Sequence, residues 1–320
     1  MARNTEMTHS KMLVVGKDVV ADGVVAVRLA DPDGRTIPAW EPGSHIDVII
    51  DESTVRHYSL CGDIEDDTSL TVAVLREEGG RGGSRWIHDS LQVGDLIGAA
   101  GPRNNFVFEQ TQTYLFVAGG IGITPLVPMM RAAEEAGAQW RLLYGGRTRA
   151  SMAFADDLAD EYAGRVELRP QDEYGILDLA TALDDVPAGT HVYCCGPEPL
   201  LQAIESECRK RPELTLHVER FVAKEKPADA VDTTFEVELV ESGTTITVDA
   251  NESVLDAVLR SGVDTPFSCR EGTCGTCEVA VVDGVPDHRD SVLTEDEQAE
   301  NDCMMICVSR SCTAKLTLDL

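Results

Sequence analysis

The sequence predicts a multidomain protein with three parts: an antiparallel β-barrel or sandwich, an α/β domain with a parallel sheet, and a small α+β domain. The chain has 320 residues, more than one hydrophobic core ordinarily organises. Short β-rich segments come first, strands alternate with helices in the middle, and a polar stretch precedes a hairpin. We expect domains at 1–108, 109–224 and 233–320, with a linker at 225–232.

The first domain is expected to consist of short strands. Between residues 11 and 108, segments rich in Val, Ile and Leu are separated by Gly, Asp and Pro, which is typical of an antiparallel barrel or sandwich. One helix is predicted over 84–91, with Ser84 as its N-cap. Two polar motifs interrupt the apolar pattern: RHYSL at 56–60 and GGRGGS at 79–84.

These two motifs together favour a flavin that carries a phosphate. Arg56 can pair with a phosphate, Tyr58 can lie along the ring system, and Ser59 can hydrogen-bond near its N5 atom. The glycines of the second motif let the backbone approach a phosphate at the start of a helix. Taken singly, the first motif is an ordinary strand and the second a flexible hairpin loop. Their combination in one domain favours the flavin.

In the middle of the chain, strands alternate with helices, which predicts a parallel sheet with helices on both faces. AGGIGITP at 118–125 follows a buried strand and opens a helix, the setting that a pyridine nucleotide needs, although it is not the G-x-G-x-x-G fingerprint. YCCGP at 193–197 ends a later strand, where parallel sheets bind ligands. Cys195 could lie by a nicotinamide, whereas a buried apolar role fits Cys194 better.

Cysteines are concentrated near the end of the chain, with six of the ten in the last 52 residues. Clustering of this kind suggests metal ligation rather than a disulfide framework. Cys269, Cys274 and Cys277 have the spacing C-x4-C-x2-C, and 29 residues separate the last of them from Cys307. This is the plant-type [2Fe–2S] arrangement. A structural zinc site fits less well, because it usually shows paired C-x2-C knuckles.

Two further cysteines, Cys303 and Cys312, lie close enough in sequence to compete for the fourth ligand position. Cys307 fits better, because it ends the apolar segment MMIC, which we predict to be a strand, and because its spacing matches. Gly272 and Gly275 would let backbone N–H groups turn toward the sulfurs.

Composition and charge argue against several functions. The net charge of −29 disfavours nucleic acid, because phosphate binding needs a stripe of Lys and Arg. No apolar run reaches the roughly 18 residues of a membrane span, and the polar start shows no signal peptide, so we expect a cytoplasmic protein. From Asp232 onward, 19 acidic residues accompany 5 basic ones. This is either a solubilising surface or a docking face for a basic partner.

In their order along the chain, RHYSL, GGRGGS, GGIGITP, YCCGP and CREGTCGTC followed by Cys307 resemble the phthalate dioxygenase reductase family, which includes vanillate demethylase reductases. The resemblance covers about residues 10–320. It implies a ferredoxin-reductase-type flavin barrel, a nucleotide domain and a plant-type ferredoxin domain of β-grasp fold. It also implies FMN, NADH as the electron donor and a [2Fe–2S] cluster.

Carried over motif by motif, the resemblance assigns residues to each site. The flavin would be held by Arg56, Tyr58, Ser59, Ala73, Val74, Leu75, Gly82, Gly83 and Ser84. The nucleotide would be held by Gly119, Gly120, Thr124, Cys195, Gly196 and Pro197. The cluster ligands would be Cys269, Cys274, Cys277 and Cys307. Phe221 resembles the aromatic residue that covers the flavin ring and moves aside for nicotinamide; otherwise it is a linker anchor. Ser59, Thr124, Cys195 and Phe221 are the residues expected at the reacting atoms.

The choice of nucleotide depends on charges after two strands. Arg147 and Arg149 follow the second strand of the middle domain and leave NADPH open. Asp172 and Glu173 follow the third strand, where a carboxylate can accept ribose hydroxyl protons and repel a 2′-phosphate. Together with the resemblance, this favours NADH.

The combined sites indicate a reductase that passes electrons from NADH through FMN to a [2Fe–2S] cluster and on, one at a time, to a Rieske oxygenase or cytochrome P450. A flavin suits this role because it accepts a hydride and releases electrons singly. One alternative is a free-standing flavin reductase or diaphorase, which would need no cluster. Another is a redox-sensing module, which would need a signalling segment. We expect a monomer whose partner has a basic docking face, and neither nucleic acid nor membrane as partner.

Overall fold

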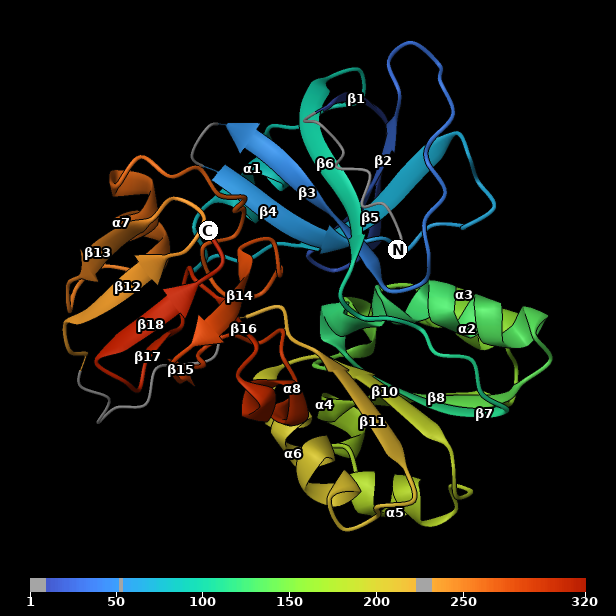
Figure 1. Ribbon diagram of the computed structural model, residues 1–320. Helices are drawn as coiled ribbons and strands as arrows, with labels where there is room; N and C mark the ends of the chain where they lie inside the picture. Colours follow the sequence, from blue (N-terminus) through green and yellow to red (C-terminus); the bar gives the residue numbers. More distant parts are fainter. Residues whose placement is uncertain (1–9, 52–53, 223–231) are drawn as a thin grey trace. The chain divides into compact units, whose positions relative to one another are not determined.

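The computed structural model describes residues 10–51, 54–222 and 232–320. They form two compact units that divide between Glu219 and Arg220 (Figure 1). Of the predicted linker, residues 225–231 lie outside the described part of the chain. Within that part, each helix is too short or too polar to cross a lipid bilayer.

The first sheet is antiparallel throughout, as the sequence predicts, with the order β4-β3-β6-β1-β2-β5. A bridge between Leu60 and Val72 connects its two outer strands and closes the sheet into a barrel. The barrel interior is filled by apolar side chains such as Val14, Ile46 and Leu70. The strands are β1 (Ser10–Ala21), β2 (Val24–Ala30), β3 (Ser44–Asp51), β4 (Thr54–Ser59), β5 (Ser69–Leu75) and β6 (Leu96–Asn104).

The second sheet is parallel, with the order β11-β10-β7-β8-β9. The chain starts in the central strand β7, builds outward through β8 and β9, and then returns to the other side of β7 with β10. Ligands bind at such a reversal, beyond the carboxyl ends of the strands. The strands are β7 (Thr113–Gly119), β8 (Gln139–Gly146), β9 (Val166–Pro170), β10 (His191–Cys195) and β11 (Thr215–Glu219).

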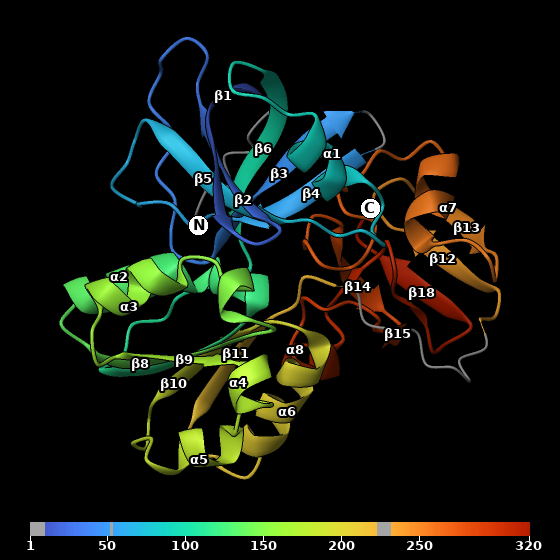
Figure 2. The ribbon, with the colours of Figure 1, turned by 180° about the vertical axis from the view of Figure 1, so that it is seen from behind.

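Helices cover both faces of this parallel sheet, which confirms the predicted α/β arrangement (Figures 1 and 2). One face carries α2 (Leu126–Glu135) and α3 (Ala155–Glu161), and the other carries α4 (Gln171–Tyr174), α5 (Leu179–Asp184) and α6 (Glu198–Cys208). Two 3₁₀ turns, η1 (Gly120–Ile123) and η2 (Arg149–Ser151), complete the connections.

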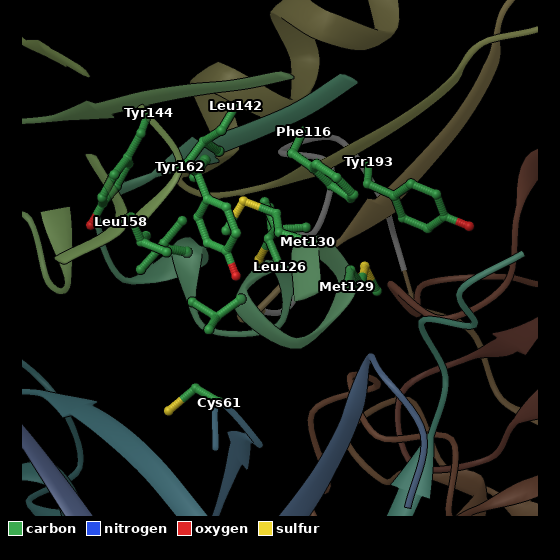
Figure 3. Close-up of a cluster of buried hydrophobic side chains, with 14 of the residues drawn as sticks. Cys61, Phe116, Leu126, Met129, Met130, Leu142, Tyr144, Leu158, Tyr162 and Tyr193 are labelled. Atoms are coloured by element: carbon green, nitrogen blue, oxygen red, sulfur yellow. The ribbon is translucent and has the colours of Figure 1, made fainter. Parts of the chain in front are cut away.

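The core on the α2 face is rich in aromatic residues. Phe116 and Tyr193 lie side by side on the sheet, with Met129 of α2 close to them (Figure 3). The same cluster includes Cys61 and Ala73 from the barrel, so the two sheets of the first unit share buried apolar surface. Burial of this area holds the ends of the barrel strands near the parallel sheet.

The second unit has a mixed five-stranded sheet with the order β13-β12-β18-β14-β16, in which β12 and β18 are parallel. Helix α7 contributes buried side chains, including Leu255 and Val258, to its core. This is the predicted β-grasp type of α+β fold. Its elements are β12 (Phe235–Leu239), β13 (Thr244–Val248), α7 (Val254–Arg260), β14 (Glu278–Asp283), β15 (Pro286–Asp287), α8 (Glu295–Glu300), β16 (Cys303–Met305), β17 (Arg310–Ser311) and β18 (Lys315–Leu318).

Two local predictions were wrong. Helix α1 (Gly83–Asp89) has Gly82 at its N-cap, because only glycine adopts its φ of 89° without strain. Ser84 therefore lies inside the first turn, where its hydroxyl accepts a hydrogen bond from the Glu77 N–H at 3.0 Å. Strand β16 ends at Met305 rather than at Cys307, because the next N–H, from Ile306, bonds to the carbonyl of Cys277 in the cysteine loop.

Candidate functional site

The two flavin motifs of the sequence meet in the barrel. The Arg56 guanidinium on β4 donates to the carbonyl of Arg81 at 3.1 Å, inside the loop that enters α1. The arginine stem also lies against Gly83, where an added Cβ would come within 2.8 Å of Arg56 Cγ. A larger residue at 83 would have to displace the arginine side chain, so glycine lets the backbone approach this cation closely. This arrangement of a cation and glycine backbone fits a phosphate.

Other expected flavin residues lie on strands β4 and β5. Tyr58 shares a face of β4 with Arg56, and burial raises the pKa of its phenol to about 12. Ala73, Val74 and Leu75 occupy the last positions of β5. Tyr58 therefore stays a neutral, amphipathic ring that is suited to lie along an aromatic cofactor.

Ser59, at the end of β4, is buried and hydrogen-bonds the carboxyl group of Glu219, at the end of β11. Burial raises the pKa of Glu219 to about 8. The Cys195 thiol donates to the same carboxyl group, with Sγ and Oε2 3.9 Å apart. Burial also raises the pKa of Cys195 well above its usual value, so it remains a thiol. The ends of three strands from both sheets of the first unit thus bring polar groups together.

The glycine motifs of the nucleotide domain interlock at the reversal point of the sheet. A Cβ at Gly119 would lie 2.6 Å from Pro197 Cδ and 3.3 Å from the Cα of Gly196. A Cβ at Gly122 would overlap the Cys195 carbonyl. Thr124 is buried, and its hydroxyl donates to the Ile121 carbonyl at 3.0 Å. The hydroxyl proton is therefore engaged inside the turn. In both loops, therefore, the absence of side chains lets another group come close to the backbone at the strand ends.

Two further expected residues, Asp172 and Phe221, are exposed. Asp172 is exposed in α4, directly after the edge strand β9. Phe221 belongs to the second unit and is 40% exposed. Of the two competing cations, Arg149 is engaged by Asp156, with an Nε–Oδ1 distance of 3.1 Å.

The four expected cluster cysteines, Cys269, Cys274, Cys277 and Cys307, are all buried in the second unit. Cys269 Sγ interacts with the thiols of Cys274 and Cys307, and Cys277 interacts with Cys307. Hydrogen bonds from these neighbouring thiols lower the pKa of Cys269. Four clustered sulfurs in an apolar unit form the donor set that a [2Fe–2S] cluster requires.

The loop backbone turns its N–H groups toward the sulfurs, as the glycines predict. The N–H groups of Glu271 and Thr273 donate to Cys269 Sγ at 3.2 and 3.5 Å. Gly272 and Gly275 have φ values of 69° and 71°, and Arg270 has 58°. This run of left-handed residues curls the chain around the sulfur position and supplies donors that stabilise a thiolate.

Cys303 and Cys312 are placed elsewhere. Cys303 pairs with Ala280 between β16 and β14, and burial raises its pKa to about 12. Cys312 is exposed and donates to the Pro286 carbonyl at 3.6 Å. Within the described residues, the thiol cluster thus consists of the four expected cysteines.

Sequence reasoning missed two residues that organise these sites. Glu219 lies two residues before Phe221, and the sequence there gives no signal of a half-buried carboxyl group that contacts Ser59. Asp290 is fully buried and accepts hydrogen bonds from the N–H groups of Val292 and Leu293 at 3.1 and 2.8 Å. A single acid in a polar segment is indistinguishable from a surface residue until its burial is known.

Comparison with known families identifies two regions of the chain. Residues 237–317 match the 2Fe-2S iron-sulfur cluster binding domain family. Residues 99–211 match the N-terminal domain of the dimethylamine monooxygenase subunit DmmA-like family.

Over nearly its full length, the chain is similar to oxygenase-associated proteins. It is 43% identical to the phenoxybenzoate dioxygenase subunit beta of Ectopseudomonas oleovorans over 94% of each chain. It superposes on phthalate dioxygenase reductase with a TM-score of 0.71 and 35% identity over 98% of each chain. It also matches an intact type IV self-sufficient cytochrome P450 monooxygenase, with a TM-score of 0.90 and 44% identity; 98% of this chain corresponds to 41% of that longer one.

Proposed function

The chain belongs to the phthalate dioxygenase reductase family, and from this premise we propose how its residues carry electrons from NADH to an oxygenase. It is an oxidoreductase, the reductase component of an oxygenase system. Its cofactors are FMN and a [2Fe–2S] cluster, and NADH is the electron donor. FMN supplies the conversion between a two-electron hydride donor and a one-electron acceptor.

In the flavin site, the Arg56 cation and the glycine backbone of the loop would hold the phosphate. Arg56 neutralises the phosphate, and Tyr58 covers part of the ring system. Ser59 keeps its hydroxyl in place through the carboxyl group of Glu219. The remaining members are Ala73, Val74, Leu75, Gly82, Gly83 and Ser84.

In the nucleotide site, the two interlocked glycine loops would present their backbone to the dinucleotide. This site comprises Gly119, Gly120, Thr124, Cys195, Gly196 and Pro197. Cys195, which stays protonated, presents a neutral surface to the nicotinamide. Asp172 selects NADH by accepting ribose hydroxyl protons, and its charge disfavours a 2′-phosphate. For Phe221, which belongs to the second unit, we keep only the role that the family resemblance implies, that of an aromatic cover for the flavin ring.

We assign residues 1–108 to the flavin domain, 109–224 to the nucleotide domain and 233–320 to the ferredoxin domain, joined by a linker at 225–232, although the division into compact units groups Arg220 and Phe221 with the ferredoxin domain. We further propose that the protein acts as a monomer in the cytoplasm.

One observation carries the proposal: the chain that sets Arg56 on the glycine loop and Ser59 on Glu219 also gathers four buried thiols with inward N–H donors. Cys307→Ser in the full chain should lose the cluster and NADH-driven reduction of cytochrome c. Reduction of ferricyanide, which takes electrons from the flavin, should persist. Cys312→Ser is the matched control and should retain both activities. A Cys307→Ser protein that reduces cytochrome c at the normal rate would refute the assigned path.

The partner oxygenase, a Rieske protein or a cytochrome P450, is proposed to dock on an acidic surface beside the cluster loop. Glu278, next to the ligand Cys277, has a raised pKa, first because of burial and then because of the nearby charges of Glu297 and Asp302. This accumulation of negative charge would attract a basic face over a distance that salt screens. Electron transfer to the oxygenase should therefore slow as ionic strength rises.

Substitutions that test docking must spare the helix itself. In α8, Glu297 closes a capping box with Thr294, accepting from the backbone N–H at 2.7 Å. Asp296 and Glu300 are exposed on the same helix, so Asp296→Lys with Glu300→Lys changes charge without removing the cap. The double variant should slow transfer to the oxygenase and leave ferricyanide reduction unchanged. If both rates fall equally, the acids serve the fold; if neither falls, they only solvate the surface.

A further inference from the structure

Three metal-ligating side chains of the first unit meet away from the flavin and nucleotide residues. His191 begins β10, His217 lies in the middle of the edge strand β11, and Glu109 precedes β7. In the register of the sheet, His217 pairs with Tyr193, two residues beyond His191, so both histidines are on the same face. They lie toward the amino ends of the parallel strands, opposite the end that carries Cys195 and Gly119.

The distances between the ligand atoms suit a single metal ion. His217 Nε2 and His191 Nδ1 are 3.0 Å apart, and His191 Nδ1 is 3.9 Å from Glu109 Oε2. All three atoms lie within 4.8 Å of one another. Metal–nitrogen bonds of about 2.0–2.1 Å place two ligands about 3.0–3.4 Å apart, so the nitrogens need little movement and the carboxylate a modest one.

Two tyrosines hold the carboxylate residue and one imidazole in place. The Glu109 N–H donates to the Tyr193 hydroxyl at 2.8 Å, and the Tyr114 hydroxyl donates to the Glu109 carbonyl at 3.0 Å. The Tyr193 ring stacks on His217 with centroids 4.3 Å apart and an interplanar angle of 6°. In Figure 3 the Tyr193 hydroxyl points away from the neighbouring Phe116. Fixing both backbone groups of Glu109 and the ring of His217 lowers the ordering cost of binding an ion.

The group is accessible, and its charge is suited to a cation. The Glu109 side chain is 57% exposed and that of His191 is 16% exposed, which gives an ion a route from solvent. Within the described residues, the Glu109 carboxylate forms an ion pair with His191 and not with an arginine or lysine, so no permanent cation competes there with a metal. A second group, His45, Asp47 and His57 in the barrel, differs in this respect. There the Arg103 guanidinium already binds Asp47, so an added metal would face a fixed positive charge.

We propose that Glu109, His191 and His217 form a binding site for one divalent transition-metal ion, with Zn²⁺ as the expected occupant. Imidazole and carboxylate ligands favour such metals, and three protein ligands leave a coordination position for water. The ion joins the edge strand β11 to the segment that precedes β7. Since β11 ends at Glu219, this clamp stiffens the strand that carries the carboxyl group bound to Ser59.

The test measures Zn²⁺ binding to the oxidised holoenzyme by competition with a chromophoric chelator, with the cluster absorbance followed to verify that iron is retained. We expect one equivalent of Zn²⁺, with affinity lowered about 100-fold or more in His191→Gln, His217→Gln and Glu109→Gln. Because the Glu109 side chain is largely exposed, Glu109→Gln should fold normally, as the flavin content will report. His57→Gln is the matched control and should bind Zn²⁺ as the wild type does.

A second probe identifies the ligands directly. Cu²⁺ added to the oxidised holoenzyme should give an electron paramagnetic resonance spectrum with splitting from two imidazole nitrogens, reduced to one in His217→Gln. The proposal is overturned if no stoichiometric Zn²⁺ binds, if Glu109→Gln and His217→Gln bind it as the wild type does, or if His57→Gln is the variant that loses it.

Discussion

Replacing Gly272 by alanine should destabilise the iron–sulfur loop far more than a single methyl group suggests. Gly272 has a φ of 69°, in the region that L-residues avoid. The new Cβ would lie 2.5 Å from Val308 Cγ2 and 3.1 Å from the Cα of Asp290. Asp290 is held by the N–H groups that its carboxylate binds, and the Ser291 N–H donates to the Gly272 carbonyl at 2.8 Å. The loop therefore has little freedom to yield.

The magnitude follows from two separable contributions. The left-handed backbone costs a non-glycine residue about 1–2 kcal/mol. Overlap in a packed interior adds about 1–3 kcal/mol. Their sum, about 2–5 kcal/mol, is a large share of the roughly 5–15 kcal/mol that stabilises a domain.

A matched control separates these contributions. Gly262 in the same unit has a φ of 87° and no atom within 4 Å of an added Cβ. Gly262→Ala should therefore show the backbone cost alone. Val308→Ala removes the clashing methyl group. Its effect on the free energy of unfolding should therefore be more favourable in the Gly272→Ala background than in the wild type, by at least about 1 kcal/mol.

The assay follows iron released to a chelator as urea unfolds the full holoenzyme. With a slope of about 1–3 kcal/mol per molar urea, Gly272→Ala should lower the midpoint of release by roughly 1–2 M, and Gly262→Ala by clearly less. Equal shifts for the two variants would show that the overlap with Val308 and Asp290 has no energetic consequence. The geometric reasoning would then fail.

Three further predictions test the first unit. The raised pKa of Glu219, about 8, means that its stabilisation is complete below about pH 4.5 and is lost as the pH rises through 8. The melting temperature of Glu219→Gln relative to that of the wild type should therefore rise from about pH 5 to 8 and stay constant above pH 8. A melting-temperature difference that does not change with pH would contradict this. Gly122→Ala should raise the KM for NADH, because its Cβ overlaps the Cys195 carbonyl. An unchanged KM would show that the loop containing Gly122 does not bind the nucleotide. Asp172→Ala should narrow the preference for NADH over NADPH in kcat/KM, and an unaltered ratio would remove Asp172 from the site.

The fold could be predicted because its determinants are local and periodic. Strand–helix alternation predicts the parallel sheet, and the four-cysteine spacing predicts the iron–sulfur domain, whose family the chain matches over 237–317. The predictions that failed concern ends of elements. Ser84 was misplaced because the left-handed backbone of Gly82 sets the start of the helix, and Cys307 was misplaced because a hydrogen bond to Cys277, distant in sequence, decides where the strand stops.

For the candidate sites, the sequence identified residues that lie in contiguous motifs. Arg56 and the glycine loop were predicted separately, and the structure places the guanidinium on that loop. The Cys195 thiol was predicted near a nicotinamide, but its contact with the Glu219 carboxyl group was not. Such a contact joins the ends of neighbouring strands and has no signature in either segment alone.

By itself, the sequence determined the chemistry that is available: thiols at ligand spacing, glycines where backbone must approach a ligand, and a cation for a phosphate. The tertiary structure decided which groups are removed from water and what they face. Glu219 and Asp290 resemble ordinary surface acids in the sequence, yet one is half-buried against Ser59 and the other is fully buried at the back of the cysteine loop. Burial and partner identity arise from contacts between distant segments, and these set a carboxyl group's pKa and its role.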